Sequence, residues 1–158
     1  MDRPSSSKGA YFGLFMLQIV GAALLTWIAL PEFRLLLSHL GEQLRTPIRN
    51  DLLSLAAVAI MQGAYWVRLL HVPSISFGKP RIFVSHLFLF LSRISFIFGS
   101  SVFSVVFFRH VPELAPGTDT LLLMWRAVLL SGSLFALFCL SLELDRFANA
   151  LAAGGERK

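Results

Sequence analysis

Apolar residues are gathered into four long blocks along the chain, and most charged residues lie between the blocks. The blocks cover residues 10–30, 51–70, 82–108 and 120–143. A helix of about 20 apolar residues crosses a hydrocarbon core of about 30 Å, and each block is long enough to do so. The blocks lack the period-two alternation of strands, and lipid tolerates no unpaired backbone groups. The pattern therefore predicts four transmembrane helices.

Helix-breaking residues separate these blocks and support the predicted boundaries. They are Pro31, Pro47, Pro73, Gly78, Pro80, Pro112, Pro116 and Gly117. We therefore predict a single four-helix domain over residues 10–153, flanked by short tails at 1–9 and 154–158. The last helix is expected to continue beyond residue 143, because an apolar stripe continues at helical spacing. This stripe consists of Leu140, Leu144, Phe147 and Leu151.

The connection between the first two blocks has a helical pattern of its own. Its apolar residues fall on one face and its polar residues on the opposite face, which predicts a short amphipathic helix over residues 31–45 lying in the membrane interface. The apolar face comprises Phe33, Leu36, Leu37, Leu40 and Leu44, and the polar face Arg34, Ser38, Gly41, Glu42 and Arg45. Such a helix is either only a surface connector, or it covers the mouth of the bundle or docks on a partner.

Composition excludes several other classes of protein. Of the 158 residues, 56% are hydrophobic and 15% are charged. Soluble domains carry about 25% charged residues, and disordered chains contain few apolar residues. A single cysteine excludes a disulfide scaffold. The sequence thus predicts an all-α integral membrane protein, a four-transmembrane-helix bundle with a short interfacial amphipathic helix.

The distribution of Lys and Arg predicts how the chain is threaded. With four spans, both termini lie on one side, together with eight basic residues: Arg3, Lys8, Arg68, Lys79, Arg81, Arg146, Arg157 and Lys158. The other side has five: Arg34, Arg45, Arg49, Arg109 and Arg126. Positive charge favours the cytoplasmic side, so we expect cytoplasmic termini in a bacterial cytoplasmic (inner) membrane. The net charge of +5 favours contact with anionic lipids. The basic residues are scattered over the loops and form no patch that would bind nucleic acid.

Arg93 is the residue most out of place, because it lies near the middle of the third block. A central arginine costs about 2.5–3.5 kcal/mol on the insertion scale. Its polar neighbours at similar depth define a candidate intramembrane cluster: His86, Arg93, Ser100 and Ser104 on the third span, with Gln18, Gln62 and Ser131 on the others. No acidic residue is expected at that depth. The cluster is then an internal hydrogen-bonded layer, a contact with a carboxylate or lipid phosphate from another molecule, or a polar path in an oligomer.

The remaining small, aromatic and charged residues of the blocks are expected to have ordinary structural roles. Small-residue ridges predict packing faces at Ala56, Ala59 and Gly63, at Ser92, Ser95 and Gly99, and at Gly132 and Ala136. The aromatic residues Trp27, Tyr65 and Trp66 are expected to anchor the helices at the interface. Acidic Glu143 and Asp145, with Arg146, are expected at the cytoplasmic mouth near Arg68, Lys79 and Arg81, in ion pairs of small value.

Little in the sequence suggests a cofactor or a reaction. Two histidines at one depth on different helices could ligate haem, but of His39, His71, His86 and His110 only His86 is well inside a block. There is no Gly-x-Ser-x-Gly elbow, His-Glu-x-x-His motif or phosphate loop. Cys139 is interpreted as a small apolar core residue. We therefore expect no cofactor, no metal site and no enzymatic activity.

The sequence-based hypothesis is a non-catalytic multi-pass membrane protein. It would be a small subunit, or an assembly or stabilising factor, of a larger membrane complex, with the bilayer and other membrane subunits or further copies of itself as partners. One alternative is an oligomeric transporter or channel component. Another is a haem- or quinone-binding membrane anchor.

Overall fold

The computed structural model is all-helical, with four long helices and no strand in the part of the chain that it describes, residues 5–38, 48–72, 77, 79–110 and 120–153. The helices are α1 (Ser5–Ser38), α2 (Ile48–His71), α3 (Ile82–His110) and α4 (Thr120–Ala152). All four are long and apolar enough to cross a membrane, with candidate spans at Gly9–Leu35, Ile48–His71, Ile82–Val102 and Met124–Ala152. The prediction of four such helices is confirmed.

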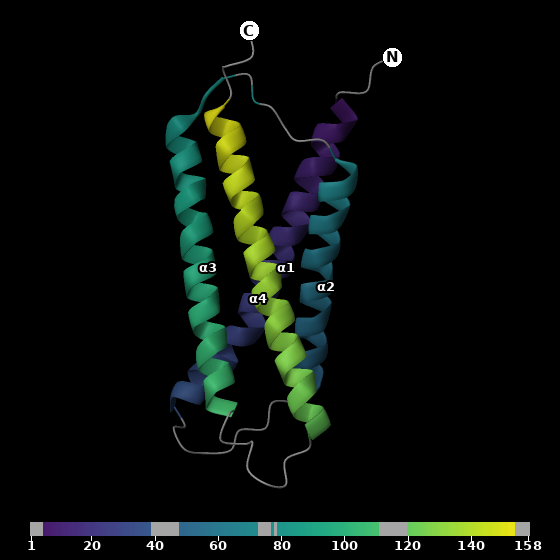
Figure 1. Cartoon of the computed structure of the whole chain (residues 1–158), viewed down its shortest axis with the longest axis vertical. Coiled ribbons are helices and arrows are strands. Elements are labelled where there is room, and N and C mark those ends of the chain that lie inside the picture. Colours follow the sequence, from purple (N-terminus) through teal and green to yellow (C-terminus); the bar gives the residue numbers. More distant parts are fainter. Residues whose placement is uncertain (1–4, 39–47, 73–76, 78, 111–119, 154–158) are drawn as a thin grey trace.

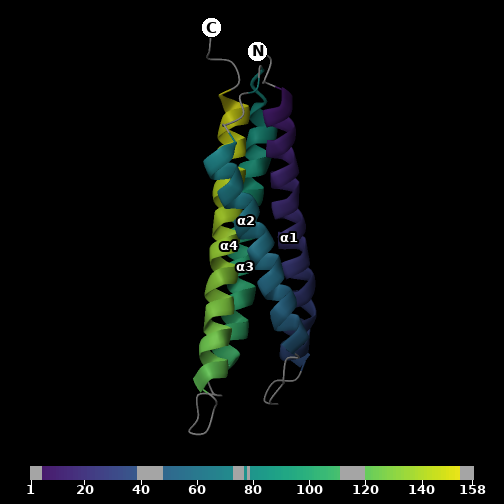
Figure 2. The ribbon, with the colours of Figure 1, turned by 90° about the vertical axis from the view of Figure 1, so that its right-hand side faces the viewer.

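The helices form an up-and-down bundle made of two hairpins. Figure 1 shows α3 and α4 side by side. The helix α1 crosses obliquely behind α4, and α2 lies on the side of α4 away from α3. In Figure 2 the pair α1 and α2 diverges from the pair α3 and α4 toward one end. The opposite end holds the start of α1, the end of α2, the start of α3 and the end of α4; we call it the terminal end.

Buried positions on α1, α2 and α4 recur mostly every three or four residues, the spacing that keeps side chains on one face. The resulting core joins α1, α2 and α4. Its buried residues are Tyr11, Phe15, Leu25, Ala57, Met61, Ala136, Leu137, Leu140, Leu144, Phe147 and Leu151. The predicted continuation of α4 beyond residue 143 is therefore confirmed, since the whole stripe from Leu140 to Leu151 is buried.

Close approach of the helices depends on small residues. This is expected in lipid, where the hydrophobic effect does not drive helices together and close van der Waals packing does. On α1, a Cβ at Gly21 would lie 2.6 Å from Met61 Cγ and 3.2 Å from the carbonyl oxygen of Ala57. On α3, a Cβ at Gly99 would lie 2.5 Å from Leu137. Ser92 strengthens the α3–α4 contact, because its buried hydroxyl donates to the carbonyl oxygen of Ser141 at 2.9 Å. The small-residue packing faces predicted on α3 and α4 are confirmed.

The small-residue ridge predicted on α2 is wrong. Ala56, Ala59 and Gly63 are all exposed, and nothing lies within 4 Å of a Cβ placed at Gly63. The face of α2 that packs is the adjacent one, formed by Ala57, Met61, Ala64, Tyr65 and Arg68. Small residues occur on both faces of this helix, so their spacing alone does not select the packed one.

Residues 31–38 do not form a separate helix. Pro31 lies within α1, which continues to Ser38. The side-chain amide of Asn50 on α2 donates to Glu32 Oε1 at 2.8 Å and holds this last part of α1 beside the start of α2. Residues 39–45 of the predicted interfacial helix lie outside the described residues.

The outward faces of all four helices carry large apolar side chains. Examples are Val20, Trp27, Leu70, Phe83, Phe90, Ile97, Met124 and Val128, each at least 60% exposed. Soluble monomers rarely present contiguous apolar surface on this scale. Trp27 and Trp66 are exposed, as expected of anchors, whereas Tyr65 is buried in the bundle and the prediction of an anchor there is wrong.

Candidate functional site: a buried arginine–glutamate cluster and an outward-facing pair

Arg93, the residue that the sequence singled out, lies on the outer face of α3. Its side chain is 74% exposed, and His86 on the same helix is exposed too. The expectation that Arg93 has no carboxylate in its own chain is wrong, because Arg93 Nη2 lies 3.7 Å from Asp145 Oδ2. The pair forms because α4 remains helical to Ala152 and runs antiparallel to α3, which brings Asp145 within reach of the long Arg93 side chain.

Among the described residues, none of the serines and glutamines of the predicted cluster makes a hydrogen bond to Arg93. The Ser100 hydroxyl donates to the carbonyl oxygen of Ile97 in its own helix at 3.0 Å. Ser104 is half-buried and Ser131 is exposed. Gln62 contacts Trp66, whose indole N–H donates to Gln62 Oε1 at 3.1 Å. These residues are distributed over several faces of the bundle and do not form one layer around Arg93.

Gln18 belongs instead to a cluster around Arg68, on the packed face of α2. The Arg68 side chain is only 2% exposed. Its Nη2 lies 3.0 Å from Glu143 Oε2 on α4 and donates at 2.8 Å to Gln18 Oε1 on α1. One guanidinium nitrogen thus links three helices in the interior of the bundle.

Glu143 is the acceptor at the centre of this cluster, and it is 3% exposed. Its Oε1 accepts a short hydrogen bond from the Tyr11 hydroxyl on α1. Its Oε2 faces Arg68 and also lies 3.7 Å from Nη1 of Arg146, which is half exposed. Both carboxylate oxygens are therefore engaged, as a buried charge requires.

Aromatic rings enclose the buried arginine. The Arg68 guanidinium carbon lies 5.2 Å from the ring centroid of Tyr11 and 5.6 Å from that of Phe15. These are cation–π distances, and such contacts stabilise a cation that has left water. Behind them stands Phe147 of α4, whose ring contacts those of Tyr11, Phe12, Phe15, Phe77 and Phe88.

A cavity of about 250 Å³ adjoins this cluster at the terminal end. Its lining combines the charged groups with apolar side chains at the end of α2 and along α4. The lining residues are Tyr11, Arg68, Leu69, Val72, Glu143, Arg146, Phe147 and Ala150. With two guanidinium groups and one carboxylate, the cavity has a net positive lining.

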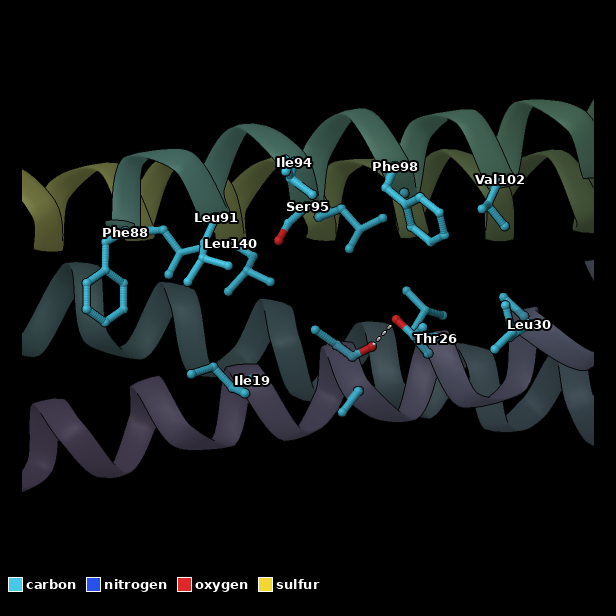
Figure 3. A pocket seen from close by; sticks show the side chains of 17 residues that line it. Ile19, Thr26, Leu30, Phe88, Leu91, Ile94, Ser95, Phe98, Val102 and Leu140 are labelled. Carbon is cyan, nitrogen blue, oxygen red and sulfur yellow. Dashed lines mark hydrogen bonds between the residues drawn. The ribbon is translucent and has the colours of Figure 1, made fainter. Parts of the chain in front are cut away.

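A second hollow, an apolar cleft of about 430 Å³, lies between α1 and α3 and is bounded behind by α4. In Figure 3 Phe88, Leu91, Ile94, Phe98 and Val102 line one wall, and Ile19, Thr26 and Leu30 line the other. Thr26 is one of its few polar residues, and its hydroxyl already donates to the carbonyl oxygen of Ala22 at 2.9 Å. The cleft is therefore a hydrophobic surface that offers few free hydrogen-bonding groups.

Among the described residues there is no group of three or more His, Cys, Asp or Glu side chains that could hold a metal ion. Cys139 is buried and lies 3.7 Å from the amide nitrogen of Gln62. His71 is exposed, and its ring nitrogen lies 3.3 Å from the carbonyl oxygen of Val67. His39 and the side chain of His110 lie outside the described residues.

The Arg68 cluster was missed because Arg68 and Glu143 stand at the ends of apolar blocks, where charged residues are ordinary. The sequence predicts exposed ion pairs between Glu143, Asp145 and Arg146 and the nearby Arg68, Lys79 and Arg81. Glu143 does pair with Arg68, but both side chains are buried inside the bundle. A usable signal was present: Ala57, Met61, Ala64 and Arg68 share one helical face. On α4, Glu143 shares a face with Ala136, Leu140 and Phe147.

Comparisons with known proteins give no further guide to function: the chain matches no protein-family model, no curated protein and no solved structure.

Proposed function

We propose that this chain is a non-catalytic integral membrane protein that serves as a small subunit, or an assembly or stabilising factor, of a larger membrane complex. The four long apolar helices with apolar outer faces support a membrane setting. The excess of basic residues in the connections at the terminal end supports cytoplasmic termini in a bacterial inner membrane.

The observation that carries the partner role is the outward-facing pair of Arg93 and Asp145. Arg93 follows Ile82 by eleven residues, about 17 Å along the helix, which is roughly halfway through a hydrocarbon core of about 30 Å. From that depth the side chain extends toward Asp145, and an arginine that faces lipid is costly and usually meets another polar group. Asp145 covers only part of the Arg93 side chain, which remains 74% exposed.

The pair is also incomplete on its acidic side. Asp145 Oδ1 is buried and has no hydrogen-bond partner in the described part of the chain. The group open to a second protein is therefore the exposed Arg93 guanidinium, to which a partner would supply an acceptor. Such polar groups attach helices to one another within membranes.

The surroundings of Arg93 suit a partner helix. His86, Phe90, Arg93 and Ile97 follow one another at helical spacing on the outer face of α3, and all four are exposed. Phe90 and Ile97 are 60% and 63% exposed. This outward stripe has apolar groups on both sides of the charge, the arrangement that lets a second helix pack closely while it satisfies the arginine.

The test is co-purification of the tagged full-length chain from its native membrane in a mild detergent. We expect Arg93→Leu to lower the yield of a co-purifying membrane protein about tenfold, since about 1.4 kcal/mol corresponds to a factor of ten. Asp145→Leu should lower it as well. Arg49→Leu is the matched control, because it removes an exposed arginine at the opposite end of the bundle.

The role is refuted if the Arg93→Leu chain inserts normally and recovers the same companion proteins in the same amounts as the unaltered chain. If the companion is a second copy of this chain, the complex is an oligomer of this protein. That result would favour the oligomeric transporter or channel over the subunit of a larger complex.

A further inference from the structure

The buried cluster around Arg68 has more hydrogen-bond donors than acceptors. A guanidinium carries five N–H groups. The two on Nη2 face Glu143 and Gln18, whereas the three on Nε and Nη1 have no partner in the described part of the chain. Each buried donor left unpaired is costly, and natural structures rarely leave several together.

Gln18 increases this excess. Its carbonyl oxygen accepts from Arg68, which fixes the orientation of the amide and leaves Nε2 as a donor. That nitrogen is buried and also lacks a partner among the described residues. In the part of the chain that the structure describes, the carboxylate of this cluster is already engaged, since Glu143 receives Tyr11 on one oxygen and faces two arginines with the other.

Arg68 lines a cavity beside these buried donors, and a small shift of its side chain would bring them to an acceptor placed there. The volume of about 250 Å³ far exceeds the roughly 30 Å³ that one water molecule occupies in the liquid. Arg146 lines the same cavity from a half-exposed position. Two guanidinium groups against one carboxylate leave one net positive charge, so an anion is the favoured occupant.

The position of the cavity identifies the kind of anion. Arg68 lies three residues from the end of α2, about 13 Å from the middle of that helix, and the edge of a hydrocarbon core lies about 15 Å from its centre. Phosphate groups of lipids occupy that level. The cavity is also at the terminal end, where the proposed topology places the anionic cytoplasmic leaflet.

We propose that this cavity is a binding site for a phosphate oxyanion, held by Arg68 and Arg146 and supplied by an anionic phospholipid headgroup or by free phosphate. The lipid source takes its membrane setting from the proposed function, whereas the site itself does not depend on the partner role of Arg93. Arg68 forms the buried wall, and Arg146 stands at the exposed side. Leu69, Val72 and Ala150 form the apolar part of the lining.

The decisive variant fills the cavity and leaves every charge in place. Ala150→Leu adds bulk to a lining residue. Ala152→Leu makes the same chemical change at an exposed position on the same helix and is the matched control. Arg146→Gln is a second test that removes one ligand of the anion while it keeps the buried pair of Arg68 and Glu143.

The lipid arm uses the full chain in bilayer discs with equal amounts of phosphatidylglycerol and phosphatidylcholine. After release into neutral detergent, retained lipids are counted by native mass spectrometry. We expect the unaltered chain and Ala152→Leu to retain phosphatidylglycerol about fivefold over phosphatidylcholine, a factor in the range that one basic residue near a charged surface gives. Ala150→Leu and Arg146→Gln should lose this preference.

The phosphate arm uses delipidated chain in neutral detergent and inorganic phosphate, with chloride at equal ionic strength. A ligand present at a hundredfold excess over its Kd should raise the melting temperature by about 5 °C or more. A rise that Ala150→Leu abolishes supports the site with free phosphate as the occupant. The proposal is overturned if neither probe binds the unaltered chain, or if Ala150→Leu and Ala152→Leu bind both probes equally; water alone would then fill the cavity.

Discussion

Arg68 and Arg93 each pair with a carboxylate of α4, yet the two pairs have opposite surroundings. The Arg68–Glu143 pair is buried, at 3.0 Å, and Gln18 and Tyr11 each add one hydrogen bond to it. The Arg93–Asp145 pair is separated by 3.7 Å, and the Arg93 side chain is largely exposed. The difference teaches that depth along a helix and direction around it are separate properties. Arg93 is deep but faces outward, whereas Arg68 lies near a helix end and faces the core.

The strongest test of this contrast is Glu143→Gln. The change keeps the size of the side chain but leaves the buried Arg68 cation without its counter-charge. We expect a loss of about 3–5 kcal/mol in the free energy of unfolding. Chemical denaturation in detergent, followed by circular dichroism, measures it.

A compensated variant checks that charge and not shape is responsible. Arg68→Met combined with Glu143→Leu removes both charges together, and such replacement of a buried pair is often neutral or stabilising. A Glu143→Gln chain as stable as the unaltered chain would show that the pair is hydrated and not buried.

A smaller effect is expected from Tyr11→Phe, which removes one donor to Glu143 and keeps the ring. Hydrogen bonds to charged groups contribute about 1.5–3 kcal/mol, so the loss in unfolding free energy should fall in that range. Tyr65→Phe is the matched control, because Tyr65 is also buried but its hydroxyl makes no hydrogen bond within the described part of the chain. Equal losses in the two variants would argue against a special role for the Tyr11 hydroxyl.

The smallest effect is expected at the outer pair. Asp145→Asn should change the free energy of unfolding of the isolated chain by less than about 1 kcal/mol, because exposed ion pairs contribute little. The same denaturation assay measures it. A loss as large as that of Glu143→Gln would mean that Arg93 faces the interior, and the contrast between the two pairs would disappear.

Much of the fold follows from apolar block length. The predicted third span, 82–108, agrees closely with α3, and the apolar stripe correctly extended the fourth beyond residue 143. The helix α1 extends beyond the predicted block 10–30 at both ends. Pro31 disfavours continuation of a helix but does not prevent it, and a contact from Asn50 on α2 supports the last part of α1.

The candidate site was harder to predict because it depends on the relative rotation of four helices. Hydropathy identified Arg93 by its depth but contained no information on which neighbour it faces. Glu143 was expected to pair near Arg68, and it does, but only the packed structure shows that Tyr11 and Gln18 from α1 complete the cluster. Contacts between residues more than a hundred positions apart, such as Tyr11 and Glu143, leave no local pattern in the sequence.

Phe147 has a consequence beyond the packing of aromatic rings. Its side chain lines the charged cavity, and it touches Phe88, which lines the apolar cleft, with ring centroids 4.8 Å apart. The ring of Phe147 thus borders both the charged cavity near Arg68 and, through Phe88, the apolar cleft. The contact between Phe147 and Phe88 therefore forms part of the apolar layer between the two hollows, and the polar lining of the cavity gives way to hydrocarbon at these rings.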